Sequence, residues 1–216
     1  KLKIPITIKQ LNLETKNRKG SLEEFLRDAR LDFFIRTTRK IKADKVALGH
    51  NLDDQAETIL MRLLRGTGLS GLSGISPKRK INGVIFIRPL LETSRREIED
   101  FLKRKRITPR IDSTNKQDLF LRNKIRHNLL PLLKNKYNQN IVEVLANLAE
   151  SVSYDYEYLD RVARSCVKGG LFRLSIKKAV KLHPAILRLR IRRAIVCIQG
   201  DTRRISFQHI REIEDL

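Results

Sequence analysis

The stretch "KVALGHNLDDQAETILMRLLRG" (residues 45–66) joins a short apolar run to an amphipathic one. Its first five residues are typical of a strand that is buried on both faces of a sheet. After the turn at residues 50–54, apolar side chains recur at helical spacing, and Gly66 is placed to end the helix. A strand that leads directly into a helix is the repeating step of an α/β fold. The apolar helical residues are Ala56, Ile59, Leu60, Leu63 and Leu64.

The segment before this stretch predicts one strand and one helix. Residues 2–13 alternate apolar and polar side chains, so we expect a strand there, with Pro5 placing its start at a sheet edge. Ser21 and Glu24 have the spacing of a capping box, which predicts a helix that runs to about residue 42. The apolar stripe expected on this helix is formed by Leu22, Leu26, Ala29 and Phe33.

The segment after it repeats the alternation. Residues 83–90 predict another strand, and Ser94 with Glu97 predicts a second capping box that opens a helix to about residue 105. Strands that alternate with helices of this length indicate α/β layers around a largely parallel sheet.

Beyond residue 133 the pattern becomes helical. Apolar residues keep one helical face from Asn138 to Lys168, and Gly169 follows as a stop signal. Pro184 suits the first turn of a further helix, and another helix is expected near Ser206. We therefore expect two domains, an α/β domain over 1–133 and a helical domain over 134–216.

The composition points to a polyanionic partner. The 216 residues carry a net charge of +22, and the basic excess is spread over both predicted domains. Lys and Arg neutralise phosphates and release counterions, so nucleic acid is the leading explanation, against a merely solvated basic surface. The chain lacks an apolar run of the roughly 18 residues that a membrane span needs. Its two cysteines, Cys166 and Cys197, lie far apart, which predicts buried thiols and fits a reducing cytoplasm.

Four acidic or imidazole side chains gather around the predicted start of the second helix. Ligands of open α/β sheets bind beyond the carboxyl ends of strands, where His50, Asp53 and Asp54 are expected. Asp54 and Glu57 are three residues apart and fall on one face of the first helical turn. The alternative is that the acids only cap the helix, which stabilises a helix by about 0.5–2 kcal/mol.

Three further motifs carry weaker signals. "GTGLSG" (residues 66–71) has the spacing of a dinucleotide fingerprint, but it follows a helix instead of a strand, so we interpret it as a mobile loop close to the substrate. Arg27 and Arg30 form a candidate phosphate clamp or a solvated basic face. Arg122, Arg126 and His127 indicate an anion site between the predicted domains.

Together these segments resemble the tRNA(Ile)-lysidine synthetase family. The resemblance rests on "GHNLDDQAETILMRLLRGTGLSGLSG", "IRPLLETSRREIEDF" and "DSTN…LRNKIRHNLLPLL", in that order, and on "SLEEFLRDARLDFF". It covers residues 1–133, and the helical remainder is similar to the tRNA-recognising domain of the family. The resemblance implies an N-type ATP pyrophosphatase fold, which is an adenine-nucleotide alpha-hydrolase-like domain with a parallel sheet.

The implied reaction uses ATP to adenylate C2 of the wobble cytidine (position 34) of an isoleucine tRNA with the anticodon CAU. The side-chain amine of free lysine then displaces AMP to form lysidine. By position, Asp54 resembles the acidic residue at the reaction centre, and Asp54 with Glu57 resembles the lysine-binding pair. His50, Arg27, Arg30 and Arg122 resemble contacts to ATP and its phosphates, and Lys124, Arg126 and His127 contacts to the tRNA. The implied cofactors and co-substrates are ATP, Mg²⁺ with unknown ligands, and L-lysine; the implied partners are tRNA(Ile) and a second copy in a homodimer.

One departure limits the expected activity. The SGGxDS phosphate loop of the family does not occur in these residues, so we expect it upstream of Lys1 and expect this chain alone to be inactive toward ATP. Two other interpretations stay open at this point. One is a tRNA thiolase of the same fold, which generally needs paired cysteines; the other is a non-catalytic basic RNA-binding module.

Overall fold

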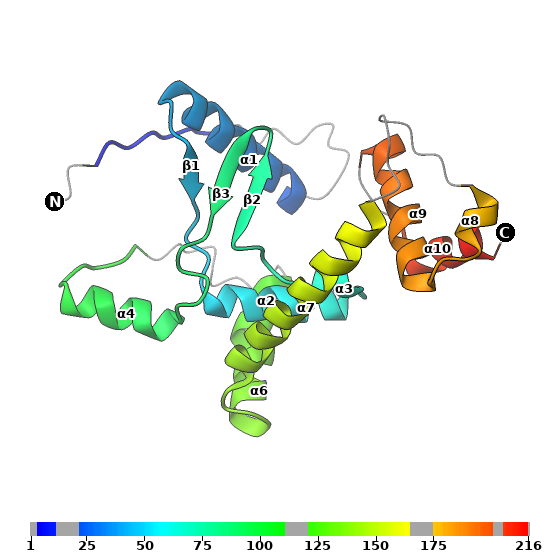
Figure 1. The fold of residues 1–216 in the computed structure, drawn as a ribbon. Helices are drawn as coiled ribbons and strands as arrows, with labels where there is room; N and C mark the ends of the chain where they lie inside the picture. The colour runs from blue at the N-terminus through cyan, green and yellow to red at the C-terminus, as the bar shows by residue number, and fades with distance from the viewer. Residues whose placement is uncertain (1–3, 12–21, 111–120, 165–174, 201–204, 216) are drawn as a thin grey trace. The chain divides into compact units, whose positions relative to one another are not determined.

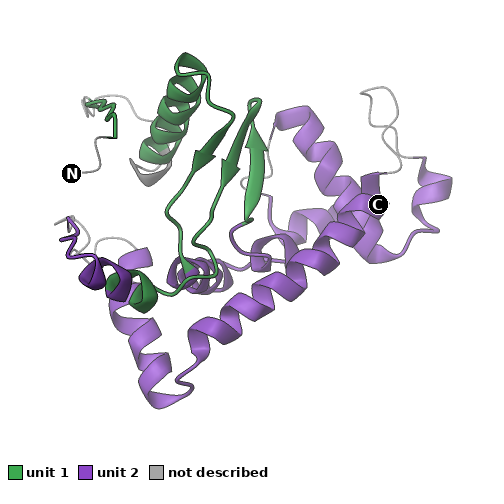
Figure 2. Ribbon diagram, turned by 60° about the vertical axis from the view of Figure 1, so that its left-hand side comes forward, with its two compact units in different colours: residues 1–51, 76–99 green, residues 52–75, 100–216 purple. Residues whose placement is uncertain are grey.

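The computed structural model describes residues 4–11, 22–110, 121–164, 175–200 and 205–215. The chain divides into two compact units (Figure 2). Unit 1 comprises residues 1–51 and 76–99, and unit 2 comprises residues 52–75 and 100–216. Each unit has a hydrophobic core of its own.

Unit 1 contains a small mixed sheet (Figure 1). Its strands β1 (Lys45–Ala47), β2 (Lys78–Ile81) and β3 (Val84–Ile87) lie in the order β1-β3-β2. β1 pairs with β3 in parallel, as expected, whereas β2 pairs with β3 antiparallel. The α/β class is confirmed, but the sheet is not largely parallel. The reason is the turn at Asn82 and Gly83, whose positive φ angles of 48° and 87° suit a tight hairpin.

Helix α1 (Leu22–Lys40) covers one face of this sheet. Ile35, Val84 and Phe86 form the buried centre, and the rings of Phe34 and Phe86 lie 6.5 Å apart between centroids. The predicted stripe is misplaced: Leu26, Ala29 and Phe33 are half-buried, and the sheet is contacted by Leu31, Phe34 and Ile35. The expected capping box at Ser21 lies outside the described residues.

Two expectations about strands are wrong. Residues 4–11 form neither strand nor helix, and Ile6 and Ile8 are 82% and 86% exposed. An alternating segment becomes a stable strand only when a neighbour takes its backbone hydrogen bonds, and no described strand pairs with these residues. In β1, Lys45 and Ala47 are exposed instead of buried, because β1 lies at an edge of the described sheet and pairs only with β3.

Helix α4 (Arg95–Arg104) begins at the predicted capping box. The backbone N–H and the hydroxyl of Ser94 both donate to Glu97 Oε2 at 2.7 Å, and the N–H of Glu97 donates back to Ser94 Oγ at 3.2 Å. The hydrogen bonds from the Ser94 side chain and backbone lower the pKa of Glu97. The sequence therefore predicts both the start of this helix and its cause.

In unit 2, helix α2 (Leu52–Leu64) packs against the long helix α7 (Ile141–Arg164). Ala56 and Ile59 of α2 are fully buried against Val142 and Ala149 of α7. Gly66 ends α2 with a φ of 75°, as expected, and its N–H donates to Leu63 O at 3.0 Å. The compact units therefore divide the chain differently from the boundary at residue 133, which stays a prediction about domains.

A continuous helical segment precedes α7. It consists of α5 (Leu121–Lys124), a π-helical turn η2 (Ile125–Leu129) and α6 (Leu130–Lys136). Leu130 joins the core between α2 and α7. The sequence does not predict the π turn, because a π turn leaves no simple hydrophobic period.

The last part of unit 2 is helical, as predicted. Helix α8 (Ile176–Ala179) precedes α9 (Pro184–Gln199), which starts at the expected proline; α10 (Phe207–Glu214) starts at the expected Ser206. Arg188 donates to Glu214 at 2.7 Å, and Arg193 donates to Asp160 of α7. Cys197 is exposed, so the expectation of a buried thiol is wrong there, and Cys166 lies outside the described residues. No helix among the described residues is long and apolar enough to span a membrane.

The core of unit 1 is most sensitive at Phe86, which is 1% exposed. We expect Phe86→Ala to lower the free energy of unfolding by about 3–5 kcal/mol, because the surrounding residues cannot fill the cavity. Phe101 of α4 is 49% exposed, so Phe101→Ala is the matched control and should change it by about 0.5 kcal/mol or less. Urea denaturation measures both; equal losses would contradict the placement of this core.

Candidate functional site

The first turn of α2 holds the acidic residues that the sequence singles out. Asp53 and Asp54 lie in this turn, where the helix dipole favours negative charge, and Glu57 follows one turn later. Glu57 is 1% exposed although it is a carboxylate. A buried carboxylate is retained in a fold only when its charge and its lone pairs are satisfied.

Two arginines satisfy the carboxylates of Asp54 and Glu57. Arg122 Nε donates to Glu57 Oε2 at 2.9 Å, and its Nη2 donates to Asp54 Oδ1 at 2.9 Å. Arg126 Nε donates to Glu57 Oε1 at 2.6 Å, while its Nη2 donates to Glu57 Oε2 at 2.8 Å and to Asp54 Oδ1 at 3.1 Å. We call these four residues the acid–arginine cluster.

The charges of the acid–arginine cluster balance. Two carboxylates face two guanidinium groups, whose side chains are 31% exposed in Arg122 and 23% exposed in Arg126. The hydrogen bond to Glu57 raises the pKa of Arg126, against the opposing effect of burial. In the cluster, the two arginine side chains are therefore closer to solvent than the two carboxylates that they contact.

The arginines come from the helical segment that contains the π turn. Arg122 lies on α5 and Arg126 on η2, four residues further on. The sequence predicts both as substrate contacts but does not predict their joint pairing with Asp54 and Glu57. The i, i+4 spacing of the arginines and the i, i+3 spacing of the acids were the available signals, but the contact joins residues 65–72 positions apart.

The other predicted site residues of unit 2 are sequence neighbours of the cluster residues. Lys124 and His127 are exposed on the same helical segment. The carboxylate of Asp53 lies 3.9 Å from the ammonium of Lys134 on α6, and its negative charge is one of the weaker influences that raise the pKa of Arg126. Of the two adjacent aspartates, Asp54 thus forms ion pairs with Arg122 and Arg126, and Asp53 with Lys134.

Arg27, Arg30 and His50 belong to unit 1. Arg27 and Arg30 are exposed on α1, and Arg27 pairs with Asp28 at 3.2 Å. His50 is half-buried in the segment that follows β1. Their predicted contacts with ATP stay predictions.

The glycine-rich segment after α2 is tied to that helix. Its centre forms the short helix α3 (Leu69–Leu72). The buried amide of Gln55 accepts from the Ile75 N–H at 2.6 Å and donates to the Ile75 carbonyl at 3.4 Å. Arg62 Nη1 donates to the carbonyls of Gly71 at 2.7 Å and Gly74 at 2.8 Å. The sequence alone suggests a mobile loop here and gives no sign that Gln55 and Arg62 anchor it.

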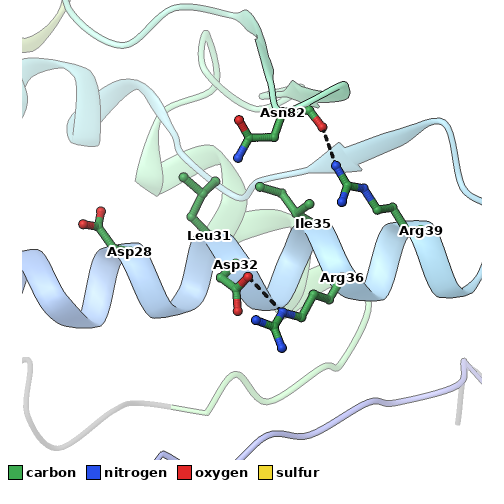
Figure 3. Close-up of a pocket in the computed structure, with 7 residues that line it drawn as sticks. All are labelled: Asp28, Leu31, Asp32, Ile35, Arg36, Arg39 and Asn82. Carbon is green, nitrogen blue, oxygen red and sulfur yellow. Dashed lines mark hydrogen bonds and ion pairs between the residues drawn. The ribbon is translucent and has the colours of Figure 1, made fainter. Parts of the chain in front are cut away.

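A hollow in unit 1 lies on α1 beside the β2–β3 turn (Figure 3). Its volume is about 420 Å³. Its charged side chains are largely matched: Arg36 pairs with Asp32 at 2.9 Å, and Arg39 donates to the Asn82 carbonyl at 2.9 Å. None of the predicted site residues contributes to its lining, which consists of Asp28, Leu31, Asp32, Ile35, Arg36, Arg39 and Asn82.

The acid–arginine cluster predicts an unusually costly substitution. Glu57→Gln leaves both arginines without their main counter-charge in a partly buried place, so we expect a loss of about 3–5 kcal/mol in the free energy of unfolding. The matched control is Glu99→Gln, whose pair with Arg95 is exposed and should contribute about 0.5 kcal/mol or less. Chemical denaturation compares the two variants, and similar small losses would show that the cluster does not stabilise unit 2.

The anchored glycine segment gives a second prediction. A Cβ on Gly74 would lie 2.7 Å from both polar atoms of the Gln55 amide, whereas a Cβ on Gly66 meets nothing within 4 Å. Both glycines have positive φ, so each alanine variant carries a backbone cost of about 1–2 kcal/mol. We expect Gly74→Ala to lose a further 1–3 kcal/mol or so, because the Gln55–Ile75 hydrogen bonds break. Thermal unfolding of the two variants checks this, and identical melting temperatures would refute it.

Comparison with known proteins places the chain in a family. A family model described as a PP-loop domain matches residues 1–133. Curated relatives include the tRNA(Ile)-lysidine synthase of Clostridioides difficile (strain 630), which is 39% identical over 203 residues and covers 91% of this chain and 43% of the relative. The tRNA(Ile)-lysidine synthase of Caldanaerobacter subterraneus subsp. tengcongensis is 35% identical over 219 residues, with 99% of this chain and 44% of the relative covered.

A solved structure is also similar: the U34-tRNA thiolase NcsA from Methanococcus maripaludis with its [4Fe-4S] cluster is 23% identical, with a TM-score of 0.46 over 61% of this chain and 45% of that one. The chain spans less than half of the length of the two curated relatives. The match to residues 1–133 is more than half of the chain, and the chain therefore belongs to the PP-loop family of ATP-utilising domains.

Proposed function

We propose that the protein containing this chain uses ATP to attach lysine to C2 of the wobble cytidine of a tRNA(Ile) with the anticodon CAU. In the first step the oxygen on C2 bonds to the α-phosphorus of ATP, and pyrophosphate leaves. In the second step the side-chain amine of lysine forms a bond to C2, and the oxygen leaves with AMP. Support comes from the curated relatives, which are named tRNA(Ile)-lysidine synthase and align with most of the chain.

The observation that carries the proposal is the acid–arginine cluster. The reaction needs a cationic group for phosphate and an anionic group for the lysine ammonium within one site. The cluster offers both charges on neighbouring helices of unit 2. An RNA-binding module without catalysis would not need a carboxylate as deeply buried as Glu57.

Asp54 and Glu57 are proposed as the lysine-binding pair, with Asp54 as the catalytic carboxylate that accepts the proton. An ammonium has to lose a proton before it can attack C2, and a neighbouring carboxylate can orient it and take that proton. Asp54 suits this task better than Glu57, since its side chain is 16% exposed and that of Glu57 is 2% exposed. Glu57 would then contribute negative charge to the site, while Asp54 would contact the lysine amine directly.

Arg122 is proposed to link ATP binding to lysine binding. It makes two hydrogen bonds to the acids where Arg126 makes three, and it is the more exposed of the two. If Arg122 turns to a phosphate of ATP, the remaining cluster of two acids and Arg126 has a net charge of −1, which attracts the lysine ammonium. Arg27, Arg30 and His50 are proposed as further contacts to ATP on the strength of the resemblance.

Magnesium is proposed to arrive with ATP. The described residues contain no group of three or more His, Cys, Asp or Glu side chains able to hold a metal ion. Mg²⁺ at nucleotide sites is held largely by phosphates and water with one or two carboxylates, and the carboxylates of Asp54 and Glu57 already face arginines. We therefore assign no step of the reaction to a metal held by these residues.

The tRNA is proposed to contact the surface beside the cluster. Lys124 and His127 are exposed there, and the net charge of +22 favours a polyanion. The helical segment 134–216 is proposed to recognise other parts of the tRNA. A homodimer is likewise proposed from the resemblance.

The test measures incorporation of radiolabelled lysine into a tRNA(Ile) transcript by the intact protein with ATP. We expect ATP-dependent incorporation, and at least about a hundredfold slower incorporation by Asp54→Asn, because positioned acid–base groups contribute that much or more. Asp53→Asn is the matched control. It removes the adjacent charge but leaves the cluster complete, so its rate should stay close to that of the unmodified protein.

Other results would overturn the proposal in different ways. A protein that ignores lysine and needs a sulfur donor is a thiolase. If the protein binds the tRNA but modifies it neither with lysine nor with sulfur, it is an RNA-binding module. Equal rates for the Asp53 and Asp54 variants would leave the reaction in place but remove Asp54 from it.

A further inference from the structure

Strand β2 presents three consecutive cations that the proposed reaction does not use. Lys78, Arg79 and Lys80 are all exposed, and β2 lies at the edge of the sheet opposite β1 (Figure 1). No ion pair joins any of the three to an acid within the part of the chain that the structure describes. Lys40 and Lys42 of the same unit also lack an acidic partner among the described residues, so this edge is distinguished by three cations that follow one another on one strand.

The register of the hairpin adds a fourth cation to this edge. Arg79 lies opposite Phe86, whose ring faces α1, so Arg79 shares that face of the sheet. Arg88 follows Phe86 by two residues on the same face, and its N–H still pairs with the Pro77 carbonyl at 3.0 Å. Lys78 and Lys80 lie on the other face, opposite Ile87 and Ile85. We call Lys78, Arg79, Lys80 and Arg88 the basic hairpin.

Arg88 is poorly compensated for a half-buried cation. Its Nη1 donates to the Ser76 carbonyl at 2.6 Å, while its Nε is buried and has no hydrogen-bond partner among the residues that the structure describes. Burial lowers the pKa of Arg88, and the neighbouring charge of Arg79 lowers it further. A guanidinium that is desolvated beside a like charge gains strongly from an anion.

A structural role for these cations explains only part of the pattern. Lysines on an edge strand prevent two sheets from pairing edge to edge, which accounts for Lys78 and Lys80. That role does not explain why Arg88 is half-buried close to the like charge of Arg79. A phosphate held between the two guanidinium groups would account for both.

We propose that the basic hairpin binds consecutive phosphates of an RNA backbone. The proposal rests on the function proposed above, in which the partner is a tRNA. Alternate side chains on a strand are roughly 6.8 Å apart, so Lys78 and Lys80 can contact different phosphates of one strand on one face while Arg79 and Arg88 hold another on the opposite face. RNA fits better than an anionic membrane, because β2 carries no exposed large apolar side chain to insert.

The experiment compares two triple variants of the intact protein. The test variant is Lys78→Gln, Arg79→Gln and Lys80→Gln; the control is Lys40→Gln, Lys42→Gln and Lys45→Gln, which removes the same charge from exposed positions of the same unit. The dissociation constant for a tRNA transcript is measured from 50 to 300 mM salt or so. We expect the test variant to bind on the order of ten- to a hundredfold more weakly near 0.15 M, and its salt slope to fall by about 2–3.

The control variant should keep the slope of the unmodified protein. Equal changes in both variants would overturn the proposal, because they would reflect net charge alone; so would an unchanged test variant, or loss of binding to anionic vesicles instead of RNA. Lysine incorporation by the unmodified protein separates the two proposals. If the unmodified protein does not incorporate lysine but the test variant binds RNA more weakly, only the proposed function is refuted. If the unmodified protein incorporates lysine but the test variant binds RNA with normal affinity, only the proposed role of the basic hairpin is refuted.

Discussion

The carboxylate of Glu57 is the constraint around which unit 2 is arranged. It is almost completely buried, so the fold has to supply its counter-charges, and Arg122 and Arg126 do so through five hydrogen bonds that also include Asp54. These bonds fix the helical segment after residue 121 against the first turn of α2. Breaking such a pair by removing one partner is far more costly than its net contribution to stability, which makes the arrangement intolerant of single changes.

Helix α2 makes a second set of hydrogen bonds through Gln55, the residue directly after Asp54. The amide of Gln55 holds Ile75, and further along the helix Arg62 holds the carbonyls of Gly71 and Gly74. The same short helix therefore fixes the arginines through Asp54 and Glu57 and the glycine-rich segment through Gln55. A substrate that moves the segment would have to work against hydrogen bonds made by a neighbour of the acids.

Local signals in the sequence predict local structure well. The capping box at Ser94 and the glycine at the end of α2 act within a few residues, so their outcome depends little on the rest of the fold. The mixed sheet could also have been predicted, since Asn82-Gly83 is a strong hairpin signal. The pairing of Arg122 with Glu57 could not, because it joins residues 65 positions apart and leaves no periodic trace. The exposure of strand β1 could not be predicted for a similar reason. An apolar run indicates that a strand can be buried, but it does not indicate how many strands or helices pack against it.

The π turn at residues 125–129 sets the phase of its helix. In an uninterrupted α-helix, Arg122, Arg126 and Leu130 would recur every four residues and project from nearly the same side. Here Arg126 lies within the wider turn and donates to Asp54 and Glu57, while Leu130 directly follows the turn and enters the apolar layer with Ala56 and Ile59. One short segment thus carries both a charged contact and an apolar contact to the same helix, α2. Regularising this turn would change the angle between Arg126 and Leu130, and with it the fit of both side chains against α2.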